Sequence, residues 1–168
     1  MRETRDSAEL AEWIRPRTGP GSIIGIDGAY GSGKSHLAAD IANRLGLAHV
    51  KIDDFASKTG QPYLLQLRYP ELRQRISGAR AQGAVLVDGI CLWGVFERLA
   101  MVPDVTVYVK KFNDDGYWAD EETCDLEIID LNSPMLQSKG AALARDVAAY
   151  HQGFDPVPKA DYIFARIV

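Results

Sequence analysis

One stretch of eight residues constrains the fold of this chain more than any other feature. It matches the pattern GxxxxGK(S/T) and consists of Gly28, Ala29, Tyr30, Gly31, Ser32, Gly33, Lys34 and Ser35. An apolar run at 22–27 precedes it, and apolar residues with helical spacing follow it at Leu37, Ile41 and Leu45. A glycine-rich turn between a strand and a helix points backbone N–H groups inward and forms an anion site at the helix N-terminus. The stretch therefore predicts a strand–loop–helix unit that binds the phosphates of a nucleotide.

The lysine and the serine of this unit have separate expected roles. We expect Lys34 to reach the β- and γ-phosphates and the Ser35 hydroxyl to ligate Mg²⁺. The adjoining His36 is included among the predicted nucleotide contacts. The alternative is a glycine-rich turn with an incidental lysine, which leaves the flanking strand and helix unexplained. A guanine-specific protein should carry an NKxD-like stretch after a later strand, and residues 110–115 do not match it, so a GTPase is disfavoured.

Short apolar runs alternate with helix-like stretches along the whole chain, which predicts an α/β fold with a mainly parallel sheet. Because these runs are nearly continuous in apolar residues, they are typical of strands covered on both faces. Five strands are expected, at 22–27, 49–55, 84–88, 105–110 and 162–168. Helices are expected at 6–15, where Asp6 and Glu9 suggest a capping box, and at 32–45, 63–82, 92–101 and 133–150. Pro70 should divide the third of these, and Ser133 with Pro134 should begin the last.

Composition restricts the class of protein. The 168 residues are 46% apolar and 25% charged, which is typical of one globular domain and excludes intrinsic disorder. No apolar run approaches the roughly 18 residues of a membrane span, and the N-terminus lacks the apolar core of a secretory signal. Two cysteines without CxxC spacing give neither a disulfide framework nor a zinc site. The net charge of −4 without a basic block argues against nucleic-acid binding. Because the two cysteines fit best as reduced thiols, we expect a cytoplasmic protein.

Carboxylates stand at the ends of two predicted strands, where doubly wound sheets bind their ligands. Asp88 closes the apolar run at 84–88, a pattern that favours support of Mg²⁺; the alternative is a turn formed with Gly89. Asp53 and Asp54 follow the run that begins at 49. Either could accept a hydrogen bond from an attacking hydroxyl and orient it toward a γ-phosphate, whereas a helix cap or turn is the alternative for one of them.

Taken in order, these residues resemble the uridine kinase and phosphoribulokinase-like group of P-loop kinases. The resemblance rests on five stretches: 24–28 with 33–35, 53–55 (DDF), 85–90 (VLVDGI), 145–147 (RDV) and 158–163 (PKADYI). It covers most of residues 22–165 and implies a three-layer fold and a five-stranded parallel sheet in the order 2-3-1-4-5 with helices on both faces. The chain length predicts that a single domain spans 1–168. The resemblance also implies transfer of the ATP γ-phosphate to a hydroxyl, with Asp53 as the catalytic base and Arg145 as a lid arginine.

The sequence departs from this group at several positions. Ala56 replaces the aromatic residue that usually follows the DDF-like motif, and Asp88 replaces a glutamate. The lid helix has Ala141 and Ala142 where further arginines are usual, with Lys139 the nearest cation. We therefore carry over the phosphoryl-transfer residues and not the acceptor, which we expect to be a nucleoside, a sugar or a similar metabolite. The alternative function is a nucleotide-binding regulator or slow NTPase that acts on a protein partner.

Two segments are expected to complete the site. The arm after Asp54 contains Tyr63 and Arg68, which we predict to bind the acceptor together with Asp53 and Asp54; solvated surface residues are the alternative. Residues 113–132 are acidic and aperiodic, which favours a lid. Because carboxylates facing ATP would repel it, we expect the acidic side chains of this lid to point to solvent.

Overall fold

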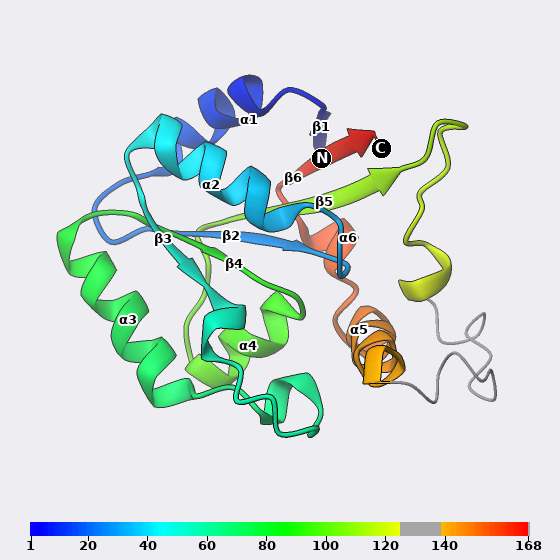
Figure 1. The fold of residues 1–168 in the computed structure, drawn as a ribbon. Coiled ribbons are helices and arrows are strands. Elements are labelled where there is room, and N and C mark those ends of the chain that lie inside the picture. Colours follow the sequence, from blue (N-terminus) through cyan, green and yellow to red (C-terminus); the bar gives the residue numbers. More distant parts are fainter. Residues whose placement is uncertain (125–138, 168) are drawn as a thin grey trace.

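The computed structural model describes residues 1–124 and 139–167, and the described residues form a six-stranded parallel sheet (Figure 1). Its strands are β1 (Arg2–Thr4), β2 (Ile23–Gly28), β3 (Ala48–Lys51), β4 (Val85–Asp88), β5 (Val105–Phe112) and β6 (Tyr162–Ile167). They lie in the order β1-β6-β5-β2-β4-β3. The strand before the glycine-rich loop, β2, therefore lies between β4 and β5, so its carboxyl end opens at the centre of the sheet.

Helices cover both faces of this sheet, as the apolar runs predicted. The α-helices are α1 (Ser7–Ile14), α2 (Lys34–Leu45), α3 (Tyr69–Gln82), α4 (Leu92–Leu99), α5 (Lys139–Phe154) and α6 (Pro156–Lys159). Figure 1 shows α1 and α2 on one face and α3 and α4 on the other. Successive residues of β2 contribute to the cores on opposite faces of the sheet. Ile24 and Ile26 pack with α1 and α2, and Ile23 packs with α3 and α4. The expected three-layer α/β class is confirmed.

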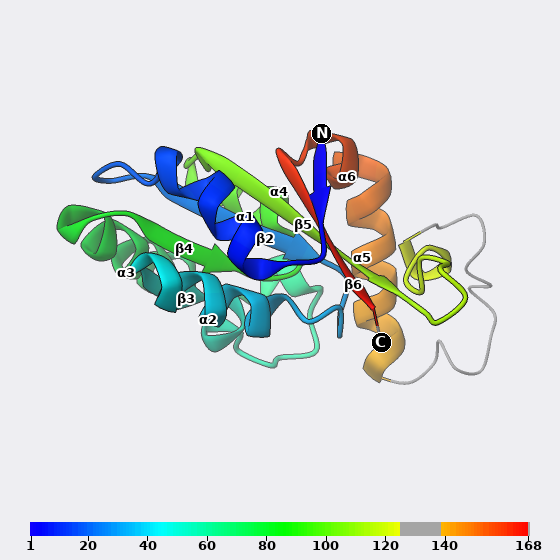
Figure 2. The same ribbon diagram turned by 90° about the horizontal axis from the view of Figure 1, so that it is seen from above.

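The expected number of five strands was wrong. The five predicted strands are neighbours in the predicted order, and β1 adds a sixth at the edge, where Arg2 pairs with Tyr162 of β6. Figure 2 shows this N-terminal strand beside β6. A three-residue charged strand has no apolar run to reveal it, and short charged strands are typical of sheet edges.

Element boundaries differ from the predictions where side chains end a strand or cap a helix. The strand expected at 49–55 ends at Lys51 and continues as a 3₁₀ turn, η2 (Ile52–Phe55). Asp6 caps α1 by accepting a hydrogen bond from the Ala8 N–H, but the predicted capping box is wrong, because Glu9 accepts its hydrogen bond from the Thr4 hydroxyl instead. The Thr4 hydroxyl oxygen in turn accepts the Asp6 N–H.

Of the helical segments that contain proline or follow the predicted lid, one agrees with the prediction and the other differs from it. Residues 63–82 divide as predicted into a 3₁₀ turn, η3 (Tyr63–Leu65), and α3, with Pro70 in the first turn of α3. The last long helix, α5, continues to Phe154 rather than ending at 150. Its predicted start at Ser133 and Pro134 lies outside the described residues. No helix of the described part of the chain is both long enough and apolar enough to span a bilayer.

Candidate active site

The glycine-rich loop joins the end of β2 to the start of α2, as the sequence predicted. Gly28 and Gly33 have φ angles of 152° and 97°, which L side chains rarely adopt. A Cβ at Gly28 would also lie 2.8 Å from both the Ser32 hydroxyl oxygen and the Val109 carbonyl oxygen. The Ser32 N–H closes the loop on the Ala29 carbonyl at 3.2 Å. The loop therefore has the tight curvature that lets backbone N–H groups converge on an anion.

Lys34 is a buried ammonium group in the first turn of α2. Its Nζ donates a hydrogen bond to the Ala29 carbonyl at 2.8 Å, which folds the side chain back over the loop. Burial lowers the pKa of Lys34, and the negative charges of nearby carboxylates oppose that shift. The carboxylates are those of Asp27, Asp53, Asp88 and Asp120. Acidic residues from several elements thus lie near enough to Lys34 to favour its charged form.

Ser35 and Asp88 meet across the loop, as expected for two groups that serve one metal ion. The Ser35 hydroxyl donates to Asp88 Oδ2 at 2.6 Å, and Asp88 is only 2% exposed at the end of β4. A hydroxyl and a carboxylate are hard oxygen donors of the kind that Mg²⁺ takes, with phosphates and waters as its other ligands, so these residues fit the ion. Within residues 1–124 and 139–167, no group of three or more histidine, cysteine or acidic residues is arranged to hold a metal ion.

Asp53 lies in η2, and a tyrosine of the following arm fixes its carboxylate. The Tyr63 hydroxyl donates to Asp53 Oδ1 at 2.6 Å, and the Tyr63 backbone N–H donates to Asp146 Oδ2 of α5 at 2.8 Å. Tyr63 is buried, which raises the pKa of its phenol, so the hydroxyl remains a donor. Asp53 itself is exposed to solvent, as a group that must meet a substrate should be. Tyr63 therefore contacts the predicted base directly.

Asp54 and Arg68 make contacts within the arm. Asp54 is exposed, and its carbonyl oxygen accepts a hydrogen bond from Arg68 Nη2 at 3.0 Å. Arg68 Nε donates to Glu71 at 2.8 Å, and its guanidinium lies over the Phe55 ring. These contacts hold the arm against the start of α3. The roles of Asp54 and Arg68 in acceptor binding stay predictions.

Helix α5 reaches the loop through a buried aspartate that the sequence reasoning did not select. Asp27, the residue before Gly28, accepts hydrogen bonds from the Tyr150 hydroxyl of α5 and from the Gly28 N–H. Burial raises the pKa of Asp27 to about 6. Arg145 lies on the exposed side of this helix, next to Asp146. Its predicted role as lid arginine stays a prediction, but its helix is joined to both Asp27 and Tyr63.

The predicted lid contains one residue that contradicts the expectation for its charges. Asp114, Asp115, Glu121 and Glu122 are exposed as expected. Asp120 is instead buried, at 8% exposure, and burial raises the pKa of its carboxyl. The prediction was wrong for this residue because Trp118, which pairs with Phe112 in a β-bridge, draws the segment back onto β5. Residues 125–132 of the predicted lid lie outside the described residues.

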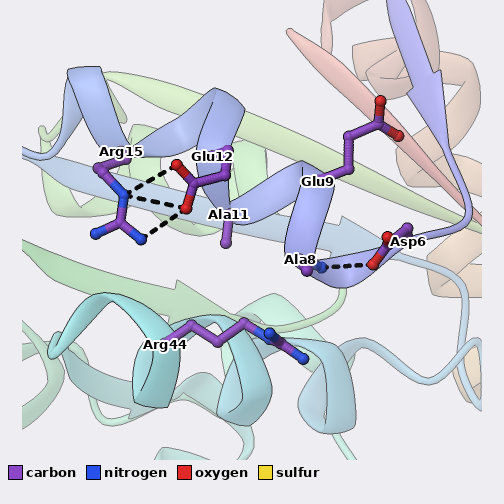
Figure 3. Close-up of a pocket in the computed structure, with 7 residues that line it drawn as sticks. All are labelled: Asp6, Ala8, Glu9, Ala11, Glu12, Arg15 and Arg44. Carbon is purple, nitrogen blue, oxygen red and sulfur yellow. Dashed lines mark hydrogen bonds and ion pairs between the residues drawn. The ribbon is translucent and has the colours of Figure 1, made fainter.

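A surface depression of about 410 Å³ lies away from these residues, between α1 and α2 (Figure 3). It is lined by Asp6, Ala8, Glu9, Ala11, Glu12, Arg15 and Arg44. Arg15 is turned to Glu12, with Nη2 2.7 Å from Oε1 of that residue, and both side chains are more than half exposed. The depression contains none of the predicted site residues.

Comparison with known proteins gives likeness in structure alone. No family model matches the chain, and no curated protein matches it. A possible uridine kinase from Bacillus stearothermophilus aligns with 94% of this chain and 96% of its own length, with a TM-score of 0.60 and 17% identity. A putative fructose transport system kinase from Silicibacter sp. aligns with 96% of this chain and 100% of its own, with a TM-score of 0.52 and 18% identity. The chain thus has the fold of P-loop kinases. At these identities the likeness does not extend to the uridine kinase family.

Proposed function

We propose that this protein is an ATP- and Mg²⁺-dependent kinase that phosphorylates a hydroxyl group of a nucleoside, a sugar or a similar small metabolite. The observation that carries the proposal is the convergence of three groups at the carboxyl edge of the sheet. They are the buried ammonium of Lys34, the bonded pair Ser35–Asp88, and the exposed carboxylate of Asp53. Phosphoryl transfer is mainly a matter of positioning and charge stabilisation, and these groups supply both.

The loop residues 28–35 and Lys34 would hold the donor nucleotide. Backbone N–H groups of the loop bind phosphate oxygens, and Lys34 donates the hydrogens not used by Ala29 to the β- and γ-phosphates. Ser35 and Asp88 would hold Mg²⁺, which would supply positive charge to neutralise the phosphates. The fold and a donor set of hydroxyl and carboxylate support this assignment.

Asp53 would act on the acceptor. With Oδ1 engaged by Tyr63, the other carboxylate oxygen accepts the proton of the acceptor hydroxyl. The acceptor oxygen forms its bond to the γ-phosphorus as the bond between that phosphorus and the β–γ bridging oxygen breaks, and ADP leaves. Arg145 would stabilise charge on the transferring group, and residues 113–132 would form the lid that excludes water.

ATP turnover measured with a panel of nucleosides, sugars and vitamins tests this proposal. We expect one class of compound to stimulate ADP formation strongly in the wild type. Asp53→Asn should lower that stimulated rate by about 10²-fold or more while nucleotide binding stays within a few-fold. The matched variant Asp54→Asn should lose less. A larger loss for Asp54→Asn would exchange the roles of the two residues, and turnover that no compound stimulates would favour a slow NTPase acting on a protein partner.

A further inference from the structure

Both oxygens of the buried Asp88 carboxylate are bonded to side chains from neighbouring elements. Oδ2 accepts from the Ser35 hydroxyl, and Oδ1 lies 2.6 Å from His49 Nε2. A carboxylate that is 2% exposed has little access to water, so its orientation depends on these two partners. The sequence reasoning gave His49 no role.

His49 is placed for this contact by the sheet itself. It lies on β3, which pairs in parallel with β4 and sets His49 opposite Leu86 and Lys51 opposite Asp88. The imidazole is 16% exposed and belongs to the strand that neighbours β4 on the side away from β2. Because an ionised carboxylate only accepts hydrogen bonds, His49 must donate through Nε2.

Of the two partners of Asp88, Ser35 would bind the metal ion in the proposed site, and His49 would keep its hydrogen bond to the carboxylate. When the Ser35 hydroxyl oxygen serves a metal ion, the bond to His49 is the contact that keeps the carboxylate turned toward the loop. Groups that orient a metal-supporting carboxylate in this way commonly change metal affinity by about 10- to 100-fold when removed. Without His49, Oδ1 would be left buried without its partner and the carboxylate would be freer to rotate.

We propose that His49 is a positioning residue that orients Asp88 and thereby sets the affinity of the nucleotide complex for Mg²⁺. The inference rests on the nucleotide and metal part of the proposed function and not on the identity of the acceptor. Because His49 makes the bond to Asp88 through Nε2, a side chain that places an N–H at the same distance from the backbone can replace the imidazole. A shorter side chain cannot reach Asp88.

Calorimetric titration of ADP, with Mg²⁺ varied and with EDTA, tests this role without relying on turnover. In His49→Ala we expect the Mg²⁺ concentration that gives half-maximal enhancement of ADP binding to rise by about tenfold or more, with ADP affinity in EDTA unchanged. His49→Gln, whose Nε2 can donate to Asp88, should recover most of the wild-type value, whereas His49→Asn should not. Arg44→Ala, at an exposed position of α2 away from Asp88, is the control and should match the wild type.

The other outcomes each contradict a defined statement. The same Mg²⁺ dependence in His49→Ala as in the wild type overturns the role of His49, and an equal loss of ADP affinity with and without Mg²⁺ reduces it to a structural contact. Should His49→Ala fail to fold, the comparison of Gln with Asn carries the test. A wild type that binds no nucleotide contradicts the proposed function and this inference with it. Normal Mg²⁺-dependent binding without phosphorylation of any acceptor contradicts the kinase proposal alone.

Discussion

Lys34 is the side chain on which the candidate site depends most. Its ammonium is buried, donates to the Ala29 carbonyl, and lies within the electrostatic influence of carboxylates from several elements. A buried cation beside a glycine-rich loop is stabilised further when phosphates arrive, because they bring charge-assisted hydrogen bonds to a site with little competing water. Loss of this group should therefore affect binding and chemistry together.

Lys34→Ala tests that expectation. We expect nucleotide affinity measured by calorimetry to fall by about tenfold or more, the effect of losing a hydrogen bond to a charged group, and turnover to be nearly abolished. Circular dichroism should show that the variant is folded, and Lys51→Ala serves as a surface control. Unchanged affinity together with unchanged turnover would contradict the assignment of the phosphate loop.

Asp27 gives a prediction about pH and stability. Burial raises its pKa from 3.8 to about 6 in the folded protein, so the folded state binds the proton more tightly than the unfolded state does. The stabilisation is fully present below pH 4 and is lost as the pH rises through 6. Between pH 4 and pH 7.5 the free energy of unfolding should lose about 2 kcal/mol through this group.

The variant Asp27→Asn isolates this contribution, because an amide keeps an acceptor for the Gly28 N–H and does not ionise. Relative to the wild type, it should gain about 2 kcal/mol in the free energy of unfolding on going from pH 4 to pH 7.5. Urea denaturation of both proteins at the two pH values measures the difference. A difference that does not vary with pH would show that Asp27 titrates alike in the folded and unfolded states.

Among the elements, the arm from η2 to the start of α3 connects the predicted base to α5. Tyr63 bonds Asp53 with its side chain and Asp146 with its backbone, so the base is fixed to the helix that bears Arg145. The neighbouring Tyr69 hydroxyl donates to the Leu64 carbonyl at 2.8 Å within the same arm. Each tyrosine hydroxyl thus donates a hydrogen bond within the arm, that of Tyr63 to the Asp53 carboxylate and that of Tyr69 to a backbone carbonyl.

Tyr63→Phe and Tyr69→Phe form a matched pair. We expect Tyr63→Phe to lower kcat by about tenfold with KM for ATP unchanged, since a misplaced base slows the chemical step without weakening nucleotide binding. Tyr69→Phe should stay close to the wild type. In an Asp53→Asn background, Tyr63→Phe should cost little more, because the two residues act through one contact. Additive losses would assign Tyr63 a role independent of Asp53.

The elements also show what a sequence can and cannot predict. The unit of β2, loop and α2 was predictable because its glycines, its lysine and the helical spacing of its apolar residues all lie within one short stretch of sequence. The contacts of Asp88 with His49 and of Asp27 with Tyr150 join residues distant in sequence, and only sheet register and helix packing bring them together. β1 was not predicted because it lacks an apolar run. The burial of Asp120 was not predicted because it depends on the segment around Trp118 pairing with β5.

At the scale of the whole molecule, strand order determines where the candidate site lies. β2 lies between β4 and β5, and the strand order reverses direction at β2. The loop that follows β2 therefore lies at the switch point where doubly wound sheets bind ligands. Lys34 with Ser35, Asp88 and Asp53 come from three successive segments of the chain and meet at this edge. Likeness to solved P-loop kinase structures extends over nearly the whole chain, which shows that the fold is the same.

The most direct test of the account follows the γ-phosphate itself. Wild-type protein is incubated with Mg²⁺ and ATP labelled with ¹⁸O in the γ-phosphate, together with the compound that best stimulates turnover, and the products are separated by mass spectrometry. The account predicts that the labelled phosphate appears on a hydroxyl of that compound, and that Asp53→Asn reduces this product by about 10²-fold or more. Label found only in inorganic phosphate, at a rate indifferent to every compound offered, would contradict it.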